Sequence, residues 1–334
     1  MARQASRRYL YKKGQLYILF SFSYLHYNKP YTYPHILSLQ KIMIPDYPKF
    51  SEFYMRFRQE LHPLFQGLKD GISEFTFANI YLFREVHSYQ ISKLKNNLFI
   101  IAGSDNGKSF FMLPFGLPEK DILQGLFREF ISMKCVSEKQ ALQLFDMGYF
   151  TIEDRDNFDY LYLREELVKL SGTKFHKKKN LINAFISSYS YEGKPLLDKY
   201  LNDAFFVLES WRKGKANHGD YHAAKEALEK MEELQLCGGI YYIDGKPAAY
   251  TLGEELGNGD TFVIHFEKAV GEYKGLYQFI NQSFAAILPE KYKTINREQD
   301  LGDEGLRQAK MTYRPSGFVK KYRAVVSADI LKSG

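Results

Sequence analysis

Residues 295–310 read INREQDLGDEGLRQAK, and this stretch decides the fold that the sequence predicts. The residues from Lys291 to Ile295 are typical of the end of a strand, and Gly302 is typical of a turn. Asp303 then has the properties of a helix N-cap, because its carboxylate can accept the unpaired backbone N–H groups of a new helical turn. The stretch therefore predicts a strand, a turn and a short helix.

Two stripes of side chains are expected on this short helix. Residues at the spacing i, i+3 and i+7 share a helix face, which predicts an inward apolar stripe and a neighbouring basic stripe. The apolar stripe comprises Leu306, Ala309 and Tyr313, and the basic stripe comprises Arg307, Lys310 and Arg314. Together with Asp300, the basic stripe predicts a pocket for an anionic substrate or a developing oxyanion. A helix with solvated charges and one structural ion pair is the alternative interpretation.

The composition predicts a globular protein of one large domain or two smaller ones. The chain has 334 residues, of which 45% are hydrophobic and 25% are charged. Its net charge of +7 suits a partner rich in phosphate, such as nucleic acid, a lipid head group or a nucleotide. Cys135 and Cys237 are too few for a disulfide framework or a zinc site, which indicates a reducing, cytoplasmic compartment. The eight histidines show no metal-ligand spacing.

The first 43 residues differ from the rest of the chain. They begin with basic residues and continue with an apolar run from Leu16 to Leu25. A transmembrane helix needs roughly 20 apolar residues, so this run is too short to span a bilayer. A secretory signal would end in a cleavage site of small residues, and the run is not followed by one. We therefore expect residues 1–43 to be a poorly ordered extension and the folded protein to begin near Met43.

The remainder of the chain shows one pattern twice. A hairpin followed by a helix is expected at 98–113 and 121–133, and again at 238–252 and 275–288, the second time with a long strand at 261–269. We interpret this as a duplicated α/β unit, with a first domain at 44–172 and a second at 173–330. A helix from Pro48 to Gln66 and a final strand from Phe318 to Val326 are also predicted.

Positive charges gather where a helix is expected to open near residue 176. They belong to His176, Lys177, Lys178 and Lys179. Cations at a helix N-terminus oppose the helix dipole and cost a few tenths of a kcal/mol to about 1 kcal/mol. A phosphate-bearing partner would offset this cost, because the helix N-terminus and the lysines would both attract it. The alternative is a solvated basic turn at a domain junction.

The long strand at 261–269 carries the best candidate for a general base. Strand alternation places His265 and Glu267 on the same face. Glu267 is the base candidate if that face lines the groove. The alternative role for Glu267 is a structural salt bridge with Arg297 or Arg307.

Several separated motifs resemble one known family. They are FTFANIY at 75–81, FHKKKN at 175–180, HFEKA at 265–269, and INREQDLG at 295–302 followed by Leu306, Arg307 and Lys310. Together they resemble the stand-alone relatives of the phosphatidylglycerol lysyltransferase C-terminal domain family, over about Ile44 to Val326. This resemblance implies an α/β (α+β) fold of two acetyltransferase-like (GNAT) domains, each with a mixed, mostly antiparallel sheet flanked by helices. It also implies a groove or tunnel between the two domains.

The same resemblance implies a transferase. Proteins of the wider group move an amino acid from an aminoacyl-tRNA to an amine or hydroxyl acceptor, here a small molecule, a peptide or a lipid head group. Asp300, Arg307 and Lys310 match the polar cluster of the second half, where Lys310 would stabilise the tRNA 3′ phosphate or the tetrahedral intermediate. Glu267 completes the expected catalytic set. The expected substrate-binding residues are His176, Lys177, Lys178, Lys179, His265, Asn296, Arg297, Tyr313 and Arg314.

No covalent enzyme intermediate is expected, because the sequence has no nucleophilic triad, Walker loop or dinucleotide fingerprint. Coenzyme A is disfavoured at the loop Val270–Gly275, which departs from the basic, glycine-spaced pyrophosphate loop of acetyltransferases and carries the repelling charge of Glu272. Two alternative functions stay open. One is an N-acetyltransferase that binds coenzyme A elsewhere, and the other is a non-catalytic protein that binds tRNA or another anionic ligand.

Overall fold

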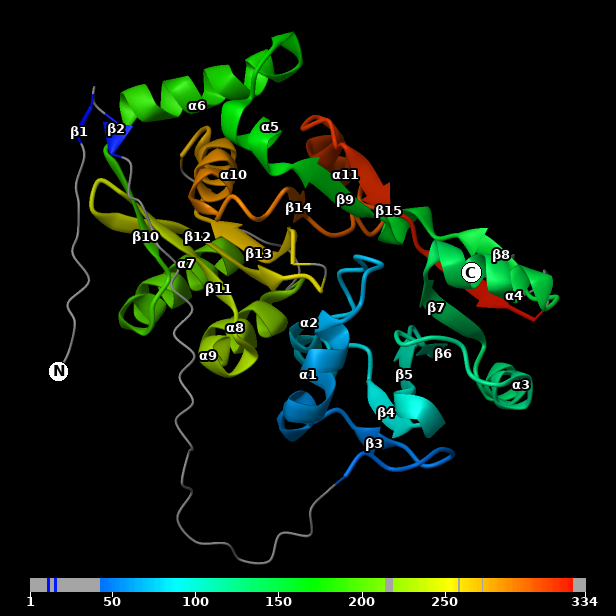
Figure 1. Cartoon of the computed structure of the whole chain (residues 1–334). Coiled ribbons are helices and arrows are strands. Elements are labelled where there is room, and N and C mark those ends of the chain that lie inside the picture. The colour runs from blue at the N-terminus through cyan, green and yellow to red at the C-terminus, as the bar shows by residue number, and fades with distance from the viewer. Residues whose placement is uncertain are drawn as a thin grey trace, which may run out of the picture.

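The computed structural model describes residues 43–213, 219–257, 259–271 and 273–326, and the backbone of two short strands, β1 (Tyr11–Lys12) and β2 (Gln15–Leu16) (Figure 1). The rest of the expected N-terminal extension lies outside the described residues, and so does Glu272. Within those ranges, no helix combines the length and the apolar character that crossing a membrane would require.

Two seven-stranded sheets form the frame of the molecule. The first has the order β3-β4-β5-β6-β7-β16-β8, with the bounds Ser51–Glu52, Gln90–Lys93, Phe99–Asp105, Lys108–Met112, Ser132–Val136, Tyr322–Val325 and Phe150–Glu153. The second has the order β10-β11-β12-β13-β14-β9-β15, with the bounds Tyr191–Pro195, Cys237–Ile243, Lys246–Glu255, Thr261–Ala269, Thr294–Asn296, Asp159–Leu163 and Gly317–Val319.

Helices connect and cover these sheets, and we assign α1–α4 with the first sheet to a first unit and α5–α11 with the second sheet to a second unit. The bounds are α1 Arg58–Gln66, α2 Phe77–Leu82, α3 Lys120–Glu129, α4 Glu138–Asp146, α5 Arg164–Lys169, α6 His176–Ser188, α7 Leu201–Lys213, α8 Tyr221–Glu229, α9 Met231–Leu234, α10 Leu276–Ile287 and α11 Glu304–Met311. In Figure 1, α10 lies on one face of the second sheet and α7 and α8 lie on the other.

Both units are built on the same plan. In the first, β4, β5 and β6 are antiparallel neighbours, and α3 then leads to β7, which is parallel to β6. In the second, β11, β12 and β13 are antiparallel neighbours, and α10 leads to β14, which is parallel to β13. The duplicated α/β unit with mixed, mostly antiparallel sheets is therefore confirmed.

The two units exchange one strand each. β9 precedes residue 173, where the second domain was expected to begin, yet it lies in the second sheet between β14 and β15. β16 comes from the end of the chain and lies in the first sheet between β7 and β8, as the red strand in Figure 1 shows. The division into 44–172 and 173–330 therefore stays a proposal, and it has to accommodate this exchange.

A shared apolar core also joins the units. Tyr250 and Phe266 of the second sheet belong to the same buried cluster as Phe77 of α2 and Phe57 at the start of α1. The opposite face of the second sheet has a separate cluster, in which Tyr241 packs with residues of α6 and α10.

Two sequence-based boundaries are wrong. The helix predicted from Pro48 begins at Arg58, because Ser51–Glu52 pair with β4 as a strand and a 3-10 turn precedes the helix. The strand predicted from Phe318 to Val326 is two strands, because the chain leaves the second sheet and enters the first between them. Lys321 lies at this crossing and is fully buried.

Candidate functional site

The two parallel strands of the second sheet separate after a short contact. β13 pairs with β14 at residues 261–263. It then continues to Ala269 with no described strand on that side. After Asn296 the chain turns away through residues 297–303, which we call the corner loop, and α11 follows. We call the region between the corner loop and residues 264–269 of β13 the wedge.

Lys310 of α11 fixes the shape of the corner loop. Its ammonium group donates to the carbonyl oxygens of Arg297 (2.6 Å), Glu298 (3.1 Å) and Gln299 (2.6 Å). Burial, followed by the positive charge of Arg297, lowers the pKa of Lys310 to about 8. An ammonium group has three N–H donors, and here all three are used by the backbone of the loop.

Asp300 and Arg307 close the far end of the corner loop. Arg307 donates from Nε and Nη2 to the two oxygens of Asp300 at 2.9 and 2.7 Å, which makes a bidentate pair. Tyr160 Oη donates to the same carboxylate at 2.5 Å, and the Gly302 N–H donates at 3.0 Å. Burial alone would raise the pKa of Asp300, but these bonds, above all those from Arg307, lower it. Because Asp300 is fully buried, the pair holds the loop from within.

Glu267 of β13 and Arg297 of the corner loop meet across the wedge. Arg297 Nη2 lies 2.7 Å from Glu267 Oε1, so the salt bridge considered as the alternative role of Glu267 is present. The other carboxylate oxygen, Oε2, has no hydrogen-bond partner in the described part of the chain. With its amide oxygen turned toward the guanidinium group, Asn281 of α10 accepts from Arg297 at 3.1 Å. The pair therefore leaves one buried carboxylate oxygen unsatisfied.

A basic residue in the first turn of α6 also lies beside the wedge. Lys178 Nζ lies 4.2 Å from the centre of the Tyr313 ring, and the guanidinium carbon of Arg297 lies 5.8 Å from it. Burial, followed by the charge of Arg297, lowers the pKa of Lys178. The start of α6 and the segment 297–314 are far apart in the sequence, and the fold brings them together. The other binding candidates on them, His176, Lys177, Lys179 and Arg314, are exposed.

His265 and Asn296 lie behind the wedge in a buried polar network. His265 contacts Glu254 through Nε2 (3.0 Å) and Glu298 through Nδ1 (2.7 Å). Burial alone would lower the pKa of His265, but the bonds to both carboxylates raise it to about 10, so the ring is a cation at neutral pH. Asn296 donates to Asp159 at 3.2 Å and accepts from the Glu298 N–H at 2.8 Å. The polar atoms of both residues are thus bonded to the protein itself.

A buried ion cluster, which the sequence analysis missed, joins this network to the first unit. Lys321 contacts Glu74 and lies 2.7 Å from Asp159 Oδ1. Glu74 also accepts from Gln299 of the corner loop at 3.3 Å. The available signal was a set of charged residues inside apolar or strand-like segments. This cluster fixes the corner loop against Ser73, whose backbone N–H donates to Asp159 at 2.8 Å.

The apolar stripe expected on α11 is wrong. Leu306 is 41% exposed and Ala309 is exposed, and only Tyr313, beyond the end of the helix, is buried. The side of α11 that bonds to the protein instead carries Arg307 and Lys310. The physical reason is that this helix packs on a polar loop rather than on an apolar core.

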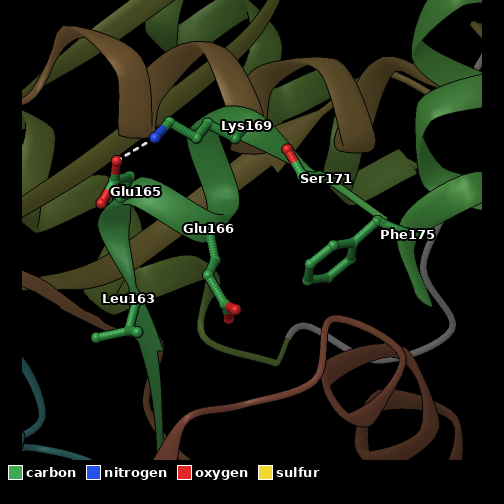
Figure 2. A pocket seen from close by; sticks show the side chains of 6 residues that line it. All are labelled: Leu163, Glu165, Glu166, Lys169, Ser171 and Phe175. Atoms are coloured by element: carbon green, nitrogen blue, oxygen red, sulfur yellow. Dashed lines mark hydrogen bonds and ion pairs between the residues drawn. The ribbon is translucent and has the colours of Figure 1, made fainter. Parts of the chain in front are cut away.

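A hollow of about 250 Å³ lies outside the wedge, beside α5 (Figure 2). It is lined by Leu163, Glu165, Glu166, Lys169, Ser171 and Phe175. Its charges are paired, Glu165 with Lys169 and Glu166 with Lys174. A second hollow, of about 10 Å³, lies between α1 and β12 at the junction of the two units. The groove or tunnel expected between the domains stays a prediction.

Comparison with solved structures finds proteins whose folds are similar to that of this chain. A conserved protein of unknown function from Bacteroides thetaiotaomicron is 30% identical, with a TM-score of 0.76 over 85% of this chain and 100% of that chain. The C-terminal domain of a putative lysylphosphatidylglycerol synthetase from Agrobacterium fabrum is 14% identical, with a TM-score of 0.58 over 84% of this chain and 95% of that chain. The expected tandem acetyltransferase-like fold class is therefore confirmed.

The sequence matches lead to the same group. An uncharacterised protein of Mycoplasmoides gallisepticum is 23% identical over 174 residues, which are 49% of this chain and 54% of that protein. The chain thus spans about half the length of this curated relative. The family model described as phosphatidylglycerol lysyltransferase, C-terminal, matches residues 65–325. The chain belongs to the family of phosphatidylglycerol lysyltransferase C-terminal domains.

Proposed function

We propose that this chain transfers an amino acid, or a similar acyl group, from an activated donor such as an aminoacyl-tRNA to an amine or hydroxyl acceptor. Its family supports an aminoacyl-transferase type of activity. The observation that carries the proposal is the wedge, where an unsatisfied carboxylate oxygen of Glu267 lies beside Arg297, a neighbour of Lys178. A proton acceptor next to positive charge is what acyl transfer requires.

Glu267 takes the proton of the attacking acceptor group in this proposal. Arg297 holds Oε1 and so fixes the orientation of the carboxylate, while Oε2 is the atom that accepts the proton. The acceptor forms its bond to the carbonyl carbon of the donor, the ester bond to the tRNA ribose breaks, and Glu267 passes the proton that it accepted to the ribose oxygen, which leaves as a hydroxyl. No side chain of the enzyme forms a covalent bond to the transferred group.

Lys178 is the residue proposed to meet negative charge. It lies over Tyr313 and has no hydrogen-bond acceptor or ion-pair partner within the described ranges. It would stabilise the oxyanion or the terminal phosphate of the donor. Lys310, by contrast, has all its donors engaged by the corner loop. We therefore assign Asp300, Arg307 and Lys310 as positioning residues that present Arg297 to the wedge.

The exposed cations near the start of α6 support a nucleic-acid donor. Lys177 and Lys179 flank Lys178, and both are exposed. Contacts from such side chains to tRNA phosphates release counterions, so this part of the affinity falls as salt concentration rises. A tRNA donor and the cytoplasmic location that it requires are part of the proposal.

A transfer assay with charged tRNA tests the proposed chemistry. The protein is mixed with tRNA carrying labelled amino acids and with amine and hydroxyl acceptors, and labelled product is counted. Glu267→Gln keeps the shape of the side chain but removes the proton acceptor, so kcat should fall by about 100-fold or more while tRNA affinity is unchanged. Glu165→Gln, at an exposed carboxylate on α5, is the matched control and should keep wild-type activity. Tight binding of tRNA without any transfer would leave the non-catalytic alternative.

Charge reversal of the α6 opening tests the donor separately. The double variant Lys177→Glu and Lys179→Glu should bind tRNA more weakly and with a flatter salt dependence, because phosphate contacts are lost. The same reversal at Lys225 and Lys230 of the α8 region, where both side chains are also solvent-accessible, serves as the control. Equal tRNA binding by both double variants would remove this patch from the proposal.

A further inference from the structure

Five buried side-chain oxygens in the second unit have no hydrogen-bond partner in the described part of the chain. Two of them are Tyr250 Oη, whose ring belongs to the core cluster on the opposite face of the sheet, and Gln299 Oε1 of the corner loop. The other three lie on the sheet face that packs against α10. They are Tyr241 Oη on β11, Thr251 Oγ1 on β12 and Glu267 Oε2 on β13. Tyr241 is 3% exposed and Thr251 is fully buried. A buried polar group without a partner destabilises the fold, so three such groups on one face indicate a ligand that satisfies them.

The strand register places these oxygens in one row across the sheet. Gly239 pairs with Thr251, and Thr251 pairs with Glu267. Directly opposed residues of neighbouring strands share a face and lie about 4.5–5.5 Å apart. Tyr241 Oη completes the row, because it lies only 3.4 Å from the position that a Cβ atom of Gly239 would occupy. A larger residue at 239 would fill the place where the tyrosine hydroxyl now lies.

The row ends at the wedge. Glu267 lies on the part of β13 that continues beyond its pairing with β14, and its other oxygen is held by Arg297. Burial, followed by the negative charge of Glu267, raises the pKa of Tyr241, which agrees with their closeness. The row therefore includes the proposed proton acceptor, Glu267 Oε2, and lies on the face that packs against α10.

The chemistry of the row fits an ammonium group better than a hydroxyl group. An ionised carboxylate only accepts hydrogen bonds, and each hydroxyl oxygen can accept as well as donate. A primary ammonium group has three N–H donors and could satisfy all three oxygens at once. An alcohol could donate to the carboxylate and accept from the two hydroxyl groups, but it carries no charge, and a hydrogen bond between an ammonium group and a carboxylate is roughly twice as strong as a neutral one.

We propose that Tyr241, Thr251 and Glu267 bind the primary ammonium group of the acceptor, so that this protein aminoacylates amines rather than alcohols. The inference rests on the proposed function and narrows it. The bound ammonium gives one proton to Glu267 Oε2, and the resulting amine forms a C–N bond to the donor carbonyl carbon. The C–O ester bond then breaks as the amide forms, and the amine nitrogen gives its second proton to the ribose oxygen, which leaves as a hydroxyl. Glu267 afterwards releases the first proton to solvent.

A binding experiment tests the row of oxygens without any transfer. Methylammonium chloride is titrated into the full-length protein and followed by NMR, with tetramethylammonium chloride as a control that has the same charge and no N–H donors. We expect saturable binding of methylammonium alone, and a loss of about 10-fold or more in affinity in Thr251→Val and in Tyr241→Phe. Both variants keep the side-chain shape, and a thermal melt checks that they fold. Equal responses to the two cations, or variants that bind like the wild type, would overturn the inference.

A transfer experiment then compares two acceptors that differ in one group. Ethanolamine phosphate and 2-hydroxyethyl phosphate carry the same phosphate and differ only in the amine or hydroxyl at the other end. We expect kcat/KM to be at least about 100-fold higher for the amine, and the two variants to raise the KM for the amine without changing that for charged tRNA. Better transfer to the alcohol would refute the inference and keep the proposed function. Methylammonium binding without transfer to either acceptor would instead count against the proposed function while upholding the ammonium site.

Discussion

The corner that follows the parallel strand is built differently in the two units. In the first unit, β7 ends at Val136 and α4 begins at once, with Ser137 as its N-cap in a reciprocal pair of bonds with Gln140. In the second unit, residues 297–302 separate β14 from Asp303, the N-cap of α11. α4 buries apolar residues in a cluster of the first unit, whereas α11 has no buried residue at all.

This difference separates a stabilising corner from a functional one. Apolar burial stabilises a fold by roughly 25 cal/mol per Å². Buried charges have to offset their loss of hydration, so apolar residues of the same volume often do as well or better. The second corner nevertheless keeps Arg297, Glu298 and Asp300 in a loop held by Lys310. Polar residues that stability does not require are best explained by function, which is why we place the proposed site there.

The charged residues beside the parallel strands differ in the same way. Lys134 follows the last residue of β7 that pairs with β6, just as Arg297 follows the last paired residue of β14. Asp105 is bonded on one oxygen by His87 (2.5 Å) and on the other by Lys134, and although burial alone would raise its pKa, these bonds lower the pKa to about 2. Glu267 keeps one oxygen without a partner. The carboxylate beside Lys134 is thus bonded on both oxygens, whereas the carboxylate beside Arg297 is bonded on only one.

The largest effect is expected where the two units are joined. Lys321→Met removes the cation between Glu74 and Asp159 and leaves two carboxylates buried side by side. Breaking a buried pair in this way costs about 3–5 kcal/mol, so the urea midpoint of unfolding should fall sharply. Lys320→Met is the matched control, because the neighbouring lysine pairs with Glu153 at the surface and should leave the midpoint almost unchanged. Similar midpoints in both variants would show that the cluster does not hold the units together.

A smaller, pH-dependent effect is expected from His265. Its pKa is raised from 6.5 to about 10 in the folded protein, so the stability that it contributes is fully present below pH 6.5 and is lost as pH rises toward 10. The wild type should therefore lose stability relative to His265→Gln across this window, with a slope of up to about 1.4 kcal/mol per pH unit.

Urea unfolding of both proteins at several pH values measures this slope. The difference between the two curves cancels the other titrating groups, including Lys310, whose lowered pKa gives a slope of the opposite sign. Two parallel curves between pH 6.5 and pH 10 would mean that His265 is not held as a cation between Glu254 and Glu298. The second corner would then lose the electrostatic feature that most distinguishes it from the first.

Sequence patterns were sufficient to predict the structural features that depend on neighbouring residues, such as turns, strands and helix caps. The turns at Asn106-Gly107 and Asp244-Gly245 have the positive φ values that their hairpins require, and both hairpins are present. The strand Thr261–Ala269 was predicted with its observed bounds. Asp303 was predicted to be an N-cap, and this is confirmed, because its side chain accepts from the Leu306 N–H at 2.7 Å.

Contacts between distant segments could not be predicted in this way. A local pattern can indicate a strand at 158–163, but it cannot show that this strand joins the sheet of the other unit. The helical spacing placed Leu306 inward because apolar residues usually face a core, and it could not show that α11 packs on a polar loop. The meeting of Lys178 with Tyr313 depends on how α6 and α11 pack, which no local pattern contains.

The smallest loss of stability is expected when the N-cap residues of the two corners are replaced. Replacing an N-cap residue with alanine costs typically about 1 kcal/mol, so Ser137→Ala and Asp303→Ala should both lower stability by about that amount. Ser137 belongs to a buried reciprocal pair with Gln140, so its replacement should cost the more of the two. Only Asp303→Ala should also lower kcat in the transfer assay, because α11 carries the lysine and arginine that hold the corner loop. Equal loss of activity in both variants would mean that stability, and not the shape of the second corner, limits transfer.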